Sequence, residues 1–373
     1  MLIPVAMLLL STALPQTPEA FPLSDPAWAF AGDSTRLETV GGREAVRLYT
    51  GSATRRDVRL QDGTIDVDVM TSRRRSFVYV RFRMEDDRNM EEMYLRPHKS
   101  ELPDAMQYAP VYRGVSAWQL YHGVRGTAAP AIVPGVWTRV RVVLSGRRAA
   151  FFLRDTVTPV MIVPLAREPR PGFLSLSAFL PAGTPGAGPI AWFSNLRVRA
   201  GVSFYRFPPD STAPLPSGVV RQWSLGQAFL PTHLEPTSLD SAWTAQMQTV
   251  TVEPNGMVAL NRWLVRPEGR TPTGDASVVA RISVNAARSG TVPLQLGFSD
   301  AATVFLNGWP LFHGDDSYLF EQRRDGLIGF DQATVFLPLR AGANDVSIVG
   351  RDRFGGWGLM ARFPEAGGLL IAP

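Results

Sequence analysis

The side chains best suited to recognition chemistry crowd into one segment, residues 93–123 (MYLRPHKSELPDAMQYAPVYRGVSAWQLYHG). Flat aromatic rings can stack on the apolar side of a pyranose ring, and planar polar groups can hydrogen-bond pairs of sugar hydroxyls. The segment supplies both kinds of side chain, in Tyr94, Arg96, His98, Lys99, Asp104, Gln107, Tyr108, Trp118, Gln119, Tyr121 and His122. This pattern predicts a carbohydrate-binding surface. The alternative is a long loop pair whose aromatic rings pack on the body of the domain.

The same region holds carboxyl groups that a hydrolase would need. Glycoside hydrolysis requires two carboxyl groups about 5–10 Å apart across the sugar, and the candidates are Glu91, Glu92 and Asp104. Adjacent residues of a strand point to opposite faces, so at most one of Glu91 and Glu92 can face a ligand. We therefore expect binding without catalysis, with a glycoside-processing enzyme as the alternative.

Two short motifs of the second half could also bind a ligand. Asp315 and Asp316 could supply oxygen ligands to Ca²⁺, although adjacent acids in a turn are more often solvated. Trp357 lies in a glycine-rich turn, residues 351–358 (RDRFGGWG), where it could stack on a sugar or fill the end of a sandwich. We expect no other cofactor. The chain has no cysteine, which excludes disulfides, thiolate metal sites and a cysteine nucleophile.

The elements that would position these residues are β-strands. Ile65, Val67 and Val69 alternate with polar residues, which is the period of a half-buried strand. Similar short segments recur with turn residues between them, and Asn307-Gly308 is a strong hairpin signal. Sustained helical periodicity is nearly absent. The pattern predicts an all-β chain.

The length of 373 residues favours two β-sandwich (jelly-roll) domains over one. Residues 207–218 (FPPDSTAPLPSG) contain four prolines, which cannot sit in a central strand and indicate a linker. We expect a signal peptide over residues 1–20, a first sandwich over 21–204, a linker over 205–218 and a second sandwich over 219–373.

Three pieces of the first half resemble the concanavalin A-like lectin/glucanase superfamily, in its laminin-G-like and glucanase-related branches. They are residues 60–69 (LQDGTIDVDV), residues 78–83 (VYVRFR) with 86–89 (DDRN), and the closing segments 137–143 and 192–198. That fold hosts lectins, hydrolases and adhesion modules alike. Glucanases of this fold carry a Glu-x-Asp-x-Glu strand, whereas Asp62, Asp66 and Asp68 stand here without the two glutamates. A relative of this fold acts on 3-keto-glycosides, so an enzyme of that kind stays open.

The second half resembles a galactose-binding-like jelly roll. Residues 302–312 (ATVFLNGWPLF) are similar to a hairpin of sugar-binding domains that are attached to glycosidases. Residues 337–346 (LPLRAGANDV) resemble the strand pair that follows that hairpin. This likeness covers residues 219–373 and implies a fold rather than an activity.

The net charge of +5 does not indicate a nucleic-acid partner. Almost all of the positive charge is arginine, spread along strand-like segments rather than gathered on one element. One tight run, Arg73-Arg74-Arg75, is expected at a hairpin tip. We therefore expect no nucleic acid to bind.

An apolar stretch near the N-terminus, residues 2–14 (LIPVAMLLLSTAL), is too short to span a bilayer. It is typical of the core of a signal peptide, with a buried first strand as the alternative. We expect an exported protein, periplasmic or extracellular, with no membrane span. The leading hypothesis is thus a non-catalytic carbohydrate-binding protein. The alternatives are a glycoside-processing hydrolase and a protein-interaction module that uses the same aromatic residues.

Overall fold

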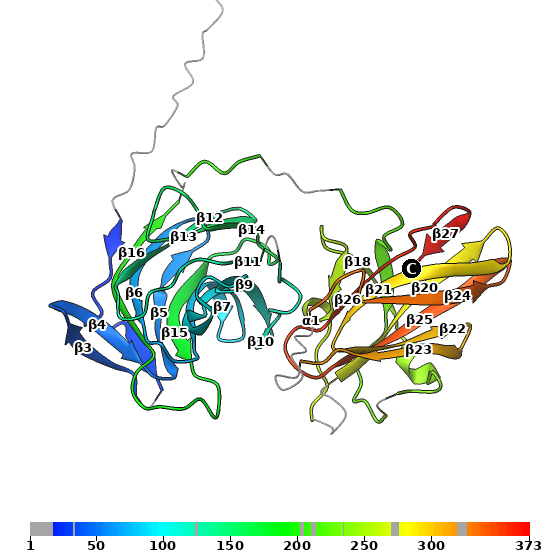
Figure 1. Ribbon diagram of the computed structural model, residues 1–373, viewed down its shortest axis with the longest axis horizontal. Coiled ribbons are helices and arrows are strands. Elements are labelled where there is room, and N and C mark those ends of the chain that lie inside the picture. Colours follow the sequence, from blue (N-terminus) through cyan, green and yellow to red (C-terminus); the bar gives the residue numbers. More distant parts are fainter. Residues whose placement is uncertain are drawn as a thin grey trace, which may run out of the picture.

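The computed structural model describes residues 18–32, 34–123, 126–201, 205–209, 214–233, 235–269, 276–318 and 327–373. The described chain is almost entirely strand, which confirms the predicted all-β class. Four antiparallel sheets form two lobes that lie side by side along the long axis (Figure 1). We call the lobe formed by β1 to β16 the first sandwich and the lobe formed by β17 to β27 the second sandwich.

The first sandwich consists of two eight-stranded sheets. One has the order β14-β13-β12-β6-β16-β4-β3, with β1 beside β16; it contains β1 (Glu19–Ala20), β3 (Arg36–Val40), β4 (Arg43–Leu48), β6 (Gly63–Thr71), β12 (Thr138–Ser145), β13 (Arg148–Leu153), β14 (Met161–Pro164) and β16 (Ala191–Ala200). The other has the order β10-β9-β8-β7-β15-β5-β2, with β11 beside β9; it contains β2 (Trp28–Ala31), β5 (Gly51–Leu60), β7 (Phe77–Asp86), β8 (Asn89–Leu95), β9 (Met106–Tyr112), β10 (Val115–Ser116), β11 (Thr127–Ala128) and β15 (Gly172–Phe179).

The core of the first sandwich lies between these two sheets. Ile65, Val67 and Val69 of β6 are buried there, as their alternation predicts. They pack in one cluster with Val80 and Phe82 of β7, which come from the opposite sheet. Burying such a side chain stabilises a fold by about 1.5–3 kcal/mol. The alternation therefore fixes which face of each strand is turned outward.

The second sandwich consists of a seven-stranded and a four-stranded sheet. The larger has the order β18-β17-β20-β25-β22-β23, with β27 beside β20; it contains β17 (Gln222–Leu225), β18 (Gln248–Thr251), β20 (Ala276–Ala286), β22 (Ala301–Leu306), β23 (Trp309–Asp315), β25 (Gly342–Asp352) and β27 (Leu369–Ala372). The smaller has the order β19-β26-β21-β24; it contains β19 (Met257–Ala259), β21 (Gly290–Ser299), β24 (Ala333–Leu339) and β26 (Gly358–Arg362).

Two predicted turns are confirmed. Asn307 and Gly308 join β22 to β23 with positive φ values of 52° and 85°, which a two-residue hairpin requires. The run Arg73–Arg75 lies between β6 and β7, at the expected tip. Residues 337–346 do form consecutive strands, but β24 belongs to the four-stranded sheet and β25 to the seven-stranded sheet, so the chain crosses the sandwich there.

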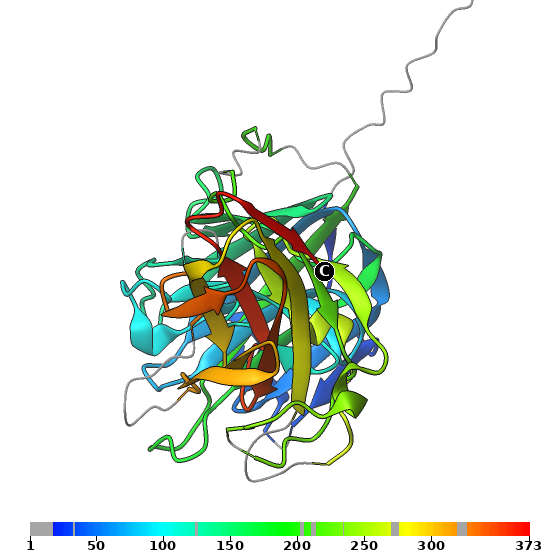
Figure 2. The same cartoon turned by 90° about the vertical axis from the view of Figure 1, so that its right-hand side faces the viewer.

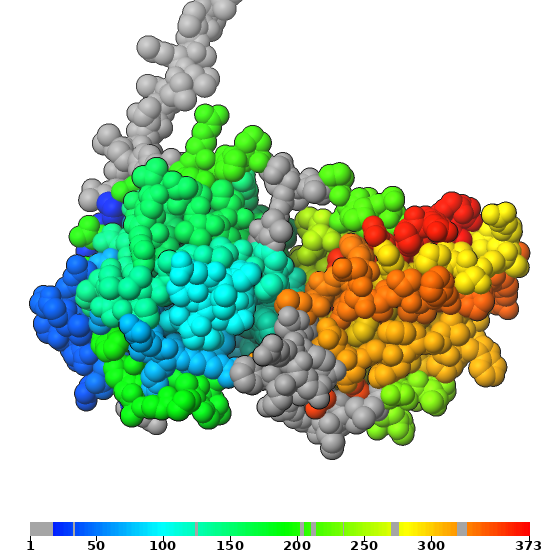
Figure 3. Space-filling model, in the orientation of Figure 1, coloured from blue at the N-terminus to red at the C-terminus, as the bar shows by residue number. Residues whose placement is uncertain are grey.

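The two sandwiches touch through a segment that follows β10. Ala117 and Leu120 of this segment pack against Met257 and Ala259 of β19 and Met360 of β26. Arg113 donates hydrogen bonds from Nη1 to the carbonyl oxygens of residues 261 and 262, at 2.7 and 3.2 Å. Figure 2 looks along the long axis with the second sandwich in front, and Figure 3 shows the surfaces of the lobes in contact.

The expected signal peptide lies almost wholly outside the described residues, and so does the centre of the expected linker, residues 210–213. The expected domain boundaries stay a prediction. Helical structure in the described part is limited to α1 (Leu260–Trp263) and the 3₁₀ turns η1 (Pro97–Lys99) and η2 (Ser241–Thr244). No helix of the described part is long and apolar enough to cross a membrane.

Candidate functional site

Aromatic and charged side chains gather on the outer side of β7, β8 and β9 and on the loop that follows β10. Val78, Val80 and Phe82 of β7 point into the core, so alternation turns the intervening side chains outward. We call this surface the aromatic face and define it by Phe77, Tyr79, Arg81, Glu92, Tyr94, Arg96, Gln107 and Trp118.

The rings on this face lie side by side because the strands pair in register. Tyr79 of β7 is opposite Tyr94 of β8, and their ring centroids are 5.2 Å apart. Phe77 stacks beside Tyr79 with centroids 6.5 Å apart and a 20° interplanar angle. Phe77 and Tyr79 are half-buried, so each side chain keeps some exposed surface.

A chain of hydrogen bonds fixes the polar groups between these rings. The Tyr94 hydroxyl donates to Gln107 Oε1 at 2.8 Å and accepts from Arg96 Nη2 at 2.9 Å. Gln107 Nε2 donates to the Trp118 carbonyl oxygen at 2.6 Å. These bonds satisfy the Tyr94 hydroxyl and both ends of the Gln107 amide, and the chain holds the loop that carries Trp118 over the sheet.

Asp104 is shared by two cations at the edge of the face. Arg96 Nη1 and Lys99 Nζ both donate to Asp104 Oδ2, the lysine at 2.6 Å. Burial opposes ionisation of Asp104, but the Lys99 hydrogen bond and the Arg96 charge outweigh it, so the pKa of this carboxyl is lowered. Asp104 is therefore a carboxylate at neutral pH.

The adjacent glutamates of β8 point to opposite sides of the sheet, as predicted. Glu92 lies on the aromatic face, where Arg81 Nε donates to it at 3.1 Å and the Ser116 hydroxyl at 2.7 Å. Glu91 points inward, is fully buried and accepts from the Tyr108 hydroxyl at 2.7 Å. Burial raises the pKa of Glu91 to about 7.

Trp118 joins the aromatic face to the second sandwich. Its ring lies 5.6 Å from the Arg96 guanidinium carbon, within range of a cation–π interaction. On its other side, Tyr318 meets it edge-on with centroids 5.8 Å apart. Phe354 follows at 5.5 Å from Tyr318 and is 52% exposed. The second sandwich thus extends the row of rings.

The loop that carries Phe354 is held by two buried polar residues. Asp300 Oδ2 accepts from the backbone N–H groups of Arg353 and Phe354 at 2.6 and 2.7 Å. Gln119 Oε1 accepts from the Gly356 N–H at 2.6 Å, although the two residues are 237 positions apart. Gly355 has a φ of 79°, a conformation that glycine adopts without strain, and it lies directly beside the Gln119 amide.

Tyr121 also contacts the second sandwich. Its hydroxyl donates to both carboxylate oxygens of Glu253 at 2.8 Å. Gln119 and Tyr121, which were predicted to contact a ligand, instead contact the second sandwich.

The remaining predicted residues are more dispersed. His98 Nδ1 accepts from the Ser76 N–H at 3.3 Å, and burial lowers the pKa of His98 to about 4. His122 is half-buried on the loop beyond Trp118. The structure does not bring Tyr108 or Trp357 to this surface: Tyr108 is buried in the first core, and Trp357 is buried in the second.

The residues suggested for Ca²⁺ already have protein partners. Asp315 Oδ2 accepts from Arg351 Nη2 at 2.9 Å, and Asp316 Oδ2 accepts from Gln332 Nε2 at 2.9 Å. Within the described ranges, no group of three or more histidine or acidic side chains gathers where it could hold a metal ion.

Sequence reasoning missed Phe77, Tyr79 and Arg81, although their alternation with Val78 and Val80 was the available signal. It also missed Tyr318 and Phe354. The sequence gives no sign that these two rings meet Trp118, because they approach it only when the sandwiches dock.

No protein-family model matches the chain, and no curated protein matches it. One similar solved structure is the carbohydrate binding module CBM66 from Bacillus subtilis, with 14% identity and a TM-score of 0.35 over 46% of this chain and 93% of that chain. Another is a Bacillus licheniformis beta-glucanase, with 11% identity and a TM-score of 0.38 over 50% and 100%. A third is a prokaryotic beta-1,3-1,4-glucanase (lichenase) derived from a mouse hindgut metagenome, with 8% identity and a TM-score of 0.38 over 50% and 99%.

These three proteins are similar to the chain at low identity. The concanavalin A-like and galactose-binding-like resemblances of the two halves stay predictions. The function proposed below rests on this chain's own residues.

Proposed function

We propose that this protein binds carbohydrate on the aromatic face and does not cleave it. The observation that carries the proposal is the row of rings from Phe77 and Tyr79 to Trp118, interleaved with polar side chains. Rings of this kind stack on sugar rings, and a guanidinium beside them can hydrogen-bond to hydroxyls. Arg81 keeps 31% of its side chain exposed and can do so, whereas Glu92, Tyr94, Arg96 and Gln107 are buried and hold the rings in place.

The polar groups are also fixed before any ligand arrives. Arg96, Tyr94 and Gln107 are held by hydrogen bonds of 2.6 to 2.9 Å. Side chains that are already ordered lose little entropy when a ligand binds. These buried groups also fix the loop that carries Trp118, which supports a preordered set of rings rather than a solvated sheet face.

The carboxyl groups support binding over hydrolysis. A glycosidase needs a protonated acid beside a second carboxylate. Asp104 stays ionised because two cations lower its pKa, as described above. Glu91 has a pKa near 7, which suits a general acid, but it points into the core with no solvent exposure. Glu92 lies on the aromatic face, but it is 1% exposed and both of its oxygens accept hydrogen bonds, from Arg81 and Ser116.

A glycan array with the purified protein tests the proposal. We expect specific binding to at least one glycan, and about tenfold weaker binding for Trp118→Ala or Tyr79→Ala, because ring contacts dominate such sites. Trp309→Ala is the matched control: this tryptophan is 76% exposed on β23 and should leave binding unchanged. Circular dichroism spectra and melting curves confirm that each variant is folded.

The alternatives give different results. Absence of binding to every glycan would overturn the proposal and favour a protein partner for the same rings. Shortening of the bound glycan, detected by chromatography and lost in Glu92→Gln, would instead establish an enzyme.

We further propose that the protein acts after export, because residues 2–14 have the character of a signal-peptide core. N-terminal sequencing of the protein recovered from a bacterial periplasm should find a first residue near Phe21, after the expected signal peptide of residues 1–20. A chain that stays in the cytoplasm and keeps its first residue would contradict this.

A further inference from the structure

An open groove in the second sandwich has no role in the proposed function. It lies where β17 ends and β18 begins, beside the end of α1, and has a volume of about 410 Å³. This volume is within the range of ligand pockets. The described residues that line the groove are Leu225, Gly226, Gln227, Ala228, Gln246, Met247, Gln248, Trp263, Leu264 and Val265.

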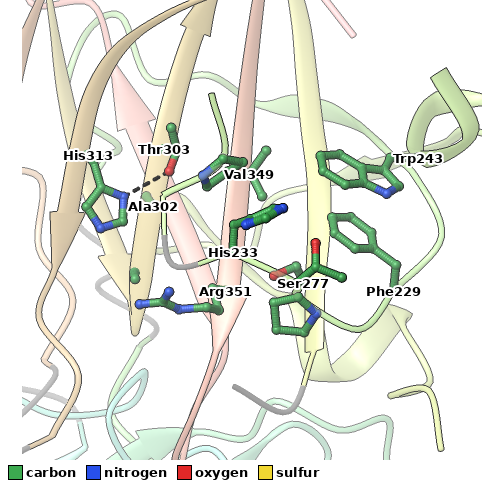
Figure 4. Close-up of a pocket in the computed structure, with 13 residues that line it drawn as sticks. Phe229, His233, Trp243, Ser277, Ala302, Thr303, His313, Val349 and Arg351 are labelled. Atoms are coloured by element: carbon green, nitrogen blue, oxygen red, sulfur yellow. Dashed lines mark hydrogen bonds between the residues drawn. The ribbon is translucent and has the colours of Figure 1, made fainter. Parts of the chain in front are cut away.

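The pocket shown in Figure 4 is much smaller than this groove. Phe229, Trp243, His313 and Arg351 are among the residues that line it, and its volume is about 20 Å³, which is enough for a single water molecule. Arg351 is 3% exposed and already pairs with Asp315 at 2.9 Å. A molecule of the size of a sugar therefore fits the groove but not this pocket.

Three glutamine amides supply the polar groups of the groove. Gln227 follows β17, Gln246 precedes β18 and Gln248 begins it, and all three side chains are exposed. Gln227 Nε2 donates to Gln246 Oε1 at 2.6 Å, so the two amides fix each other. Within the described ranges they form no other side-chain hydrogen bond. The Gln227 oxygen and the Gln246 nitrogen thus offer an acceptor and a donor, which a pair of hydroxyls can use together.

Apolar side chains form the rest of the lining. Trp263, the last residue of α1, and Met247 are half-buried, and Val265 is 67% exposed. Leu225 and Leu264 are buried. A ring with carbon on one face can therefore lie against these side chains while its polar groups meet the amides.

The lining favours an uncharged ligand, because none of the ten described lining residues is charged. The guanidinium carbon of Arg262 lies 5.4 Å from the centroid of the Trp263 ring, but Arg262 is not part of the lining. Its guanidinium also lies 3.7 Å from carboxylate oxygens of Glu168 and Glu253, which offset its charge. A charged ligand would find no opposite charge in the groove to compensate for its lost hydration.

We propose that this groove binds a neutral sugar, with a carbon-rich face of the ring against Trp263 and hydroxyls toward the three glutamines. A neutral sugar has no charge, one apolar ring face and hydroxyls that both donate and accept, which are the properties that the lining selects. The groove is separate from the aromatic face, and the proposal does not depend on the function proposed for that face.

Isothermal titration of the whole protein with glucose, galactose and mannose tests the proposal. We expect at least one of these sugars to bind with a Kd of about 10 mM or below. The uronate of the preferred sugar, titrated as its sodium salt, should bind about tenfold more weakly, because the groove lacks a cation for its carboxylate.

Variants locate the binding. Gln246→Ala and Gln248→Ala should each weaken the preferred sugar by about fivefold, because each removes an amide that hydrogen-bonds to it. Both side chains are exposed, so these changes should leave the fold intact. Gln222→Ala is the matched control: this glutamine is also exposed, at the start of β17, but does not line the groove, so the affinity should not change.

The proposal would be overturned if none of the neutral sugars binds, if both Gln246→Ala and Gln248→Ala keep full affinity, or if the uronate binds as tightly as its neutral sugar. The variant Trp118→Ala separates this site from the aromatic face. Affinity that is kept in Trp118→Ala and lowered in the two glutamine variants would support the groove. The reverse pattern would overturn it and place the sugar on the aromatic face.

Discussion

The two outer surfaces of the first sandwich arise from the same alternation but differ in what remains available to a ligand. On the outer side of β6 and β12, Arg141 pairs with Asp66 and Arg139 with Asp68, and both acids are largely buried. We call this surface the arginine face. On the aromatic face, the polar groups hold one another in place, and Tyr79, Phe77 and Trp118 are half-buried.

The two faces differ in which residues surround their polar side chains. Arginines of β12 lie opposite aspartates of β6 and neutralise them directly. The charged groups of the arginine face therefore find their partners within the same sheet. The aromatic face is bordered by the loop with Trp118 and by Tyr318 of the second sandwich. Similar strands thus give a surface of ion pairs on one side and, on the other, the surface for which we propose ligand binding.

The largest expected effect concerns the arginine face. Asp68→Ala should lower the free energy of unfolding by about 3 kcal/mol, because it leaves Arg43 and Arg139 without their buried partner. Urea denaturation measures the loss, and glycan binding should not change. Asp87→Ala is the control, since its pair with Arg56 is exposed and should contribute about 0–1 kcal/mol. Equal losses in the two variants would contradict this account of the face.

A second prediction separates the interior from the aromatic face. Glu91 has a folded pKa of about 7, above the ordinary 4.5, so its ionised form is disfavoured in the fold. The free energy of unfolding is therefore unaffected by Glu91 below pH 4.5. It falls as the pH rises through about 7, and the full decrease is about 3 kcal/mol.

Glu91→Gln cannot ionise and should lack this loss. Urea denaturation of both proteins at pH 4.5 and pH 8 gives the change in the free energy of unfolding between the two pH values. The other titrating groups contribute equally to this change in both proteins, so the difference between the proteins reports on Glu91 alone. Parallel curves for the two proteins would show that Glu91 ionises freely and is not buried between the sheets.

The smallest expected effect concerns the border with the second sandwich. Phe354→Ala should weaken glycan binding by about fivefold, or about 1 kcal/mol, because this ring continues the row beyond Trp118. Phe336→Ala, a similarly exposed phenylalanine on β24, should have no effect. If the two variants bind the glycan equally well, the ligand-binding surface ends at Trp118 and Phe354 of the second sandwich does not contribute to binding.

Part of the candidate site could be predicted from the sequence. The composition of residues 93–123 identified Arg96, Asp104, Gln107 and Trp118, which the fold brings together around Tyr94. The same composition also pointed to Tyr108, which is equally aromatic but faces the core. Composition over a loop does not say which rings turn inward, because that depends on the sheet packed beneath them.

The sequence by itself determined the all-β class, the inward face of strands such as β6, the Asn307-Gly308 hairpin and the opposed directions of Glu91 and Glu92. These follow from the two-residue period of a strand and from local turn geometry. Only the tertiary structure decided that Tyr79 lies against Tyr94, that Gln119 meets Gly356 and that Phe229 shares a pocket with His313. Such contacts join residues far apart in the chain, and they depend on which strands pair and which surfaces dock rather than on any local pattern.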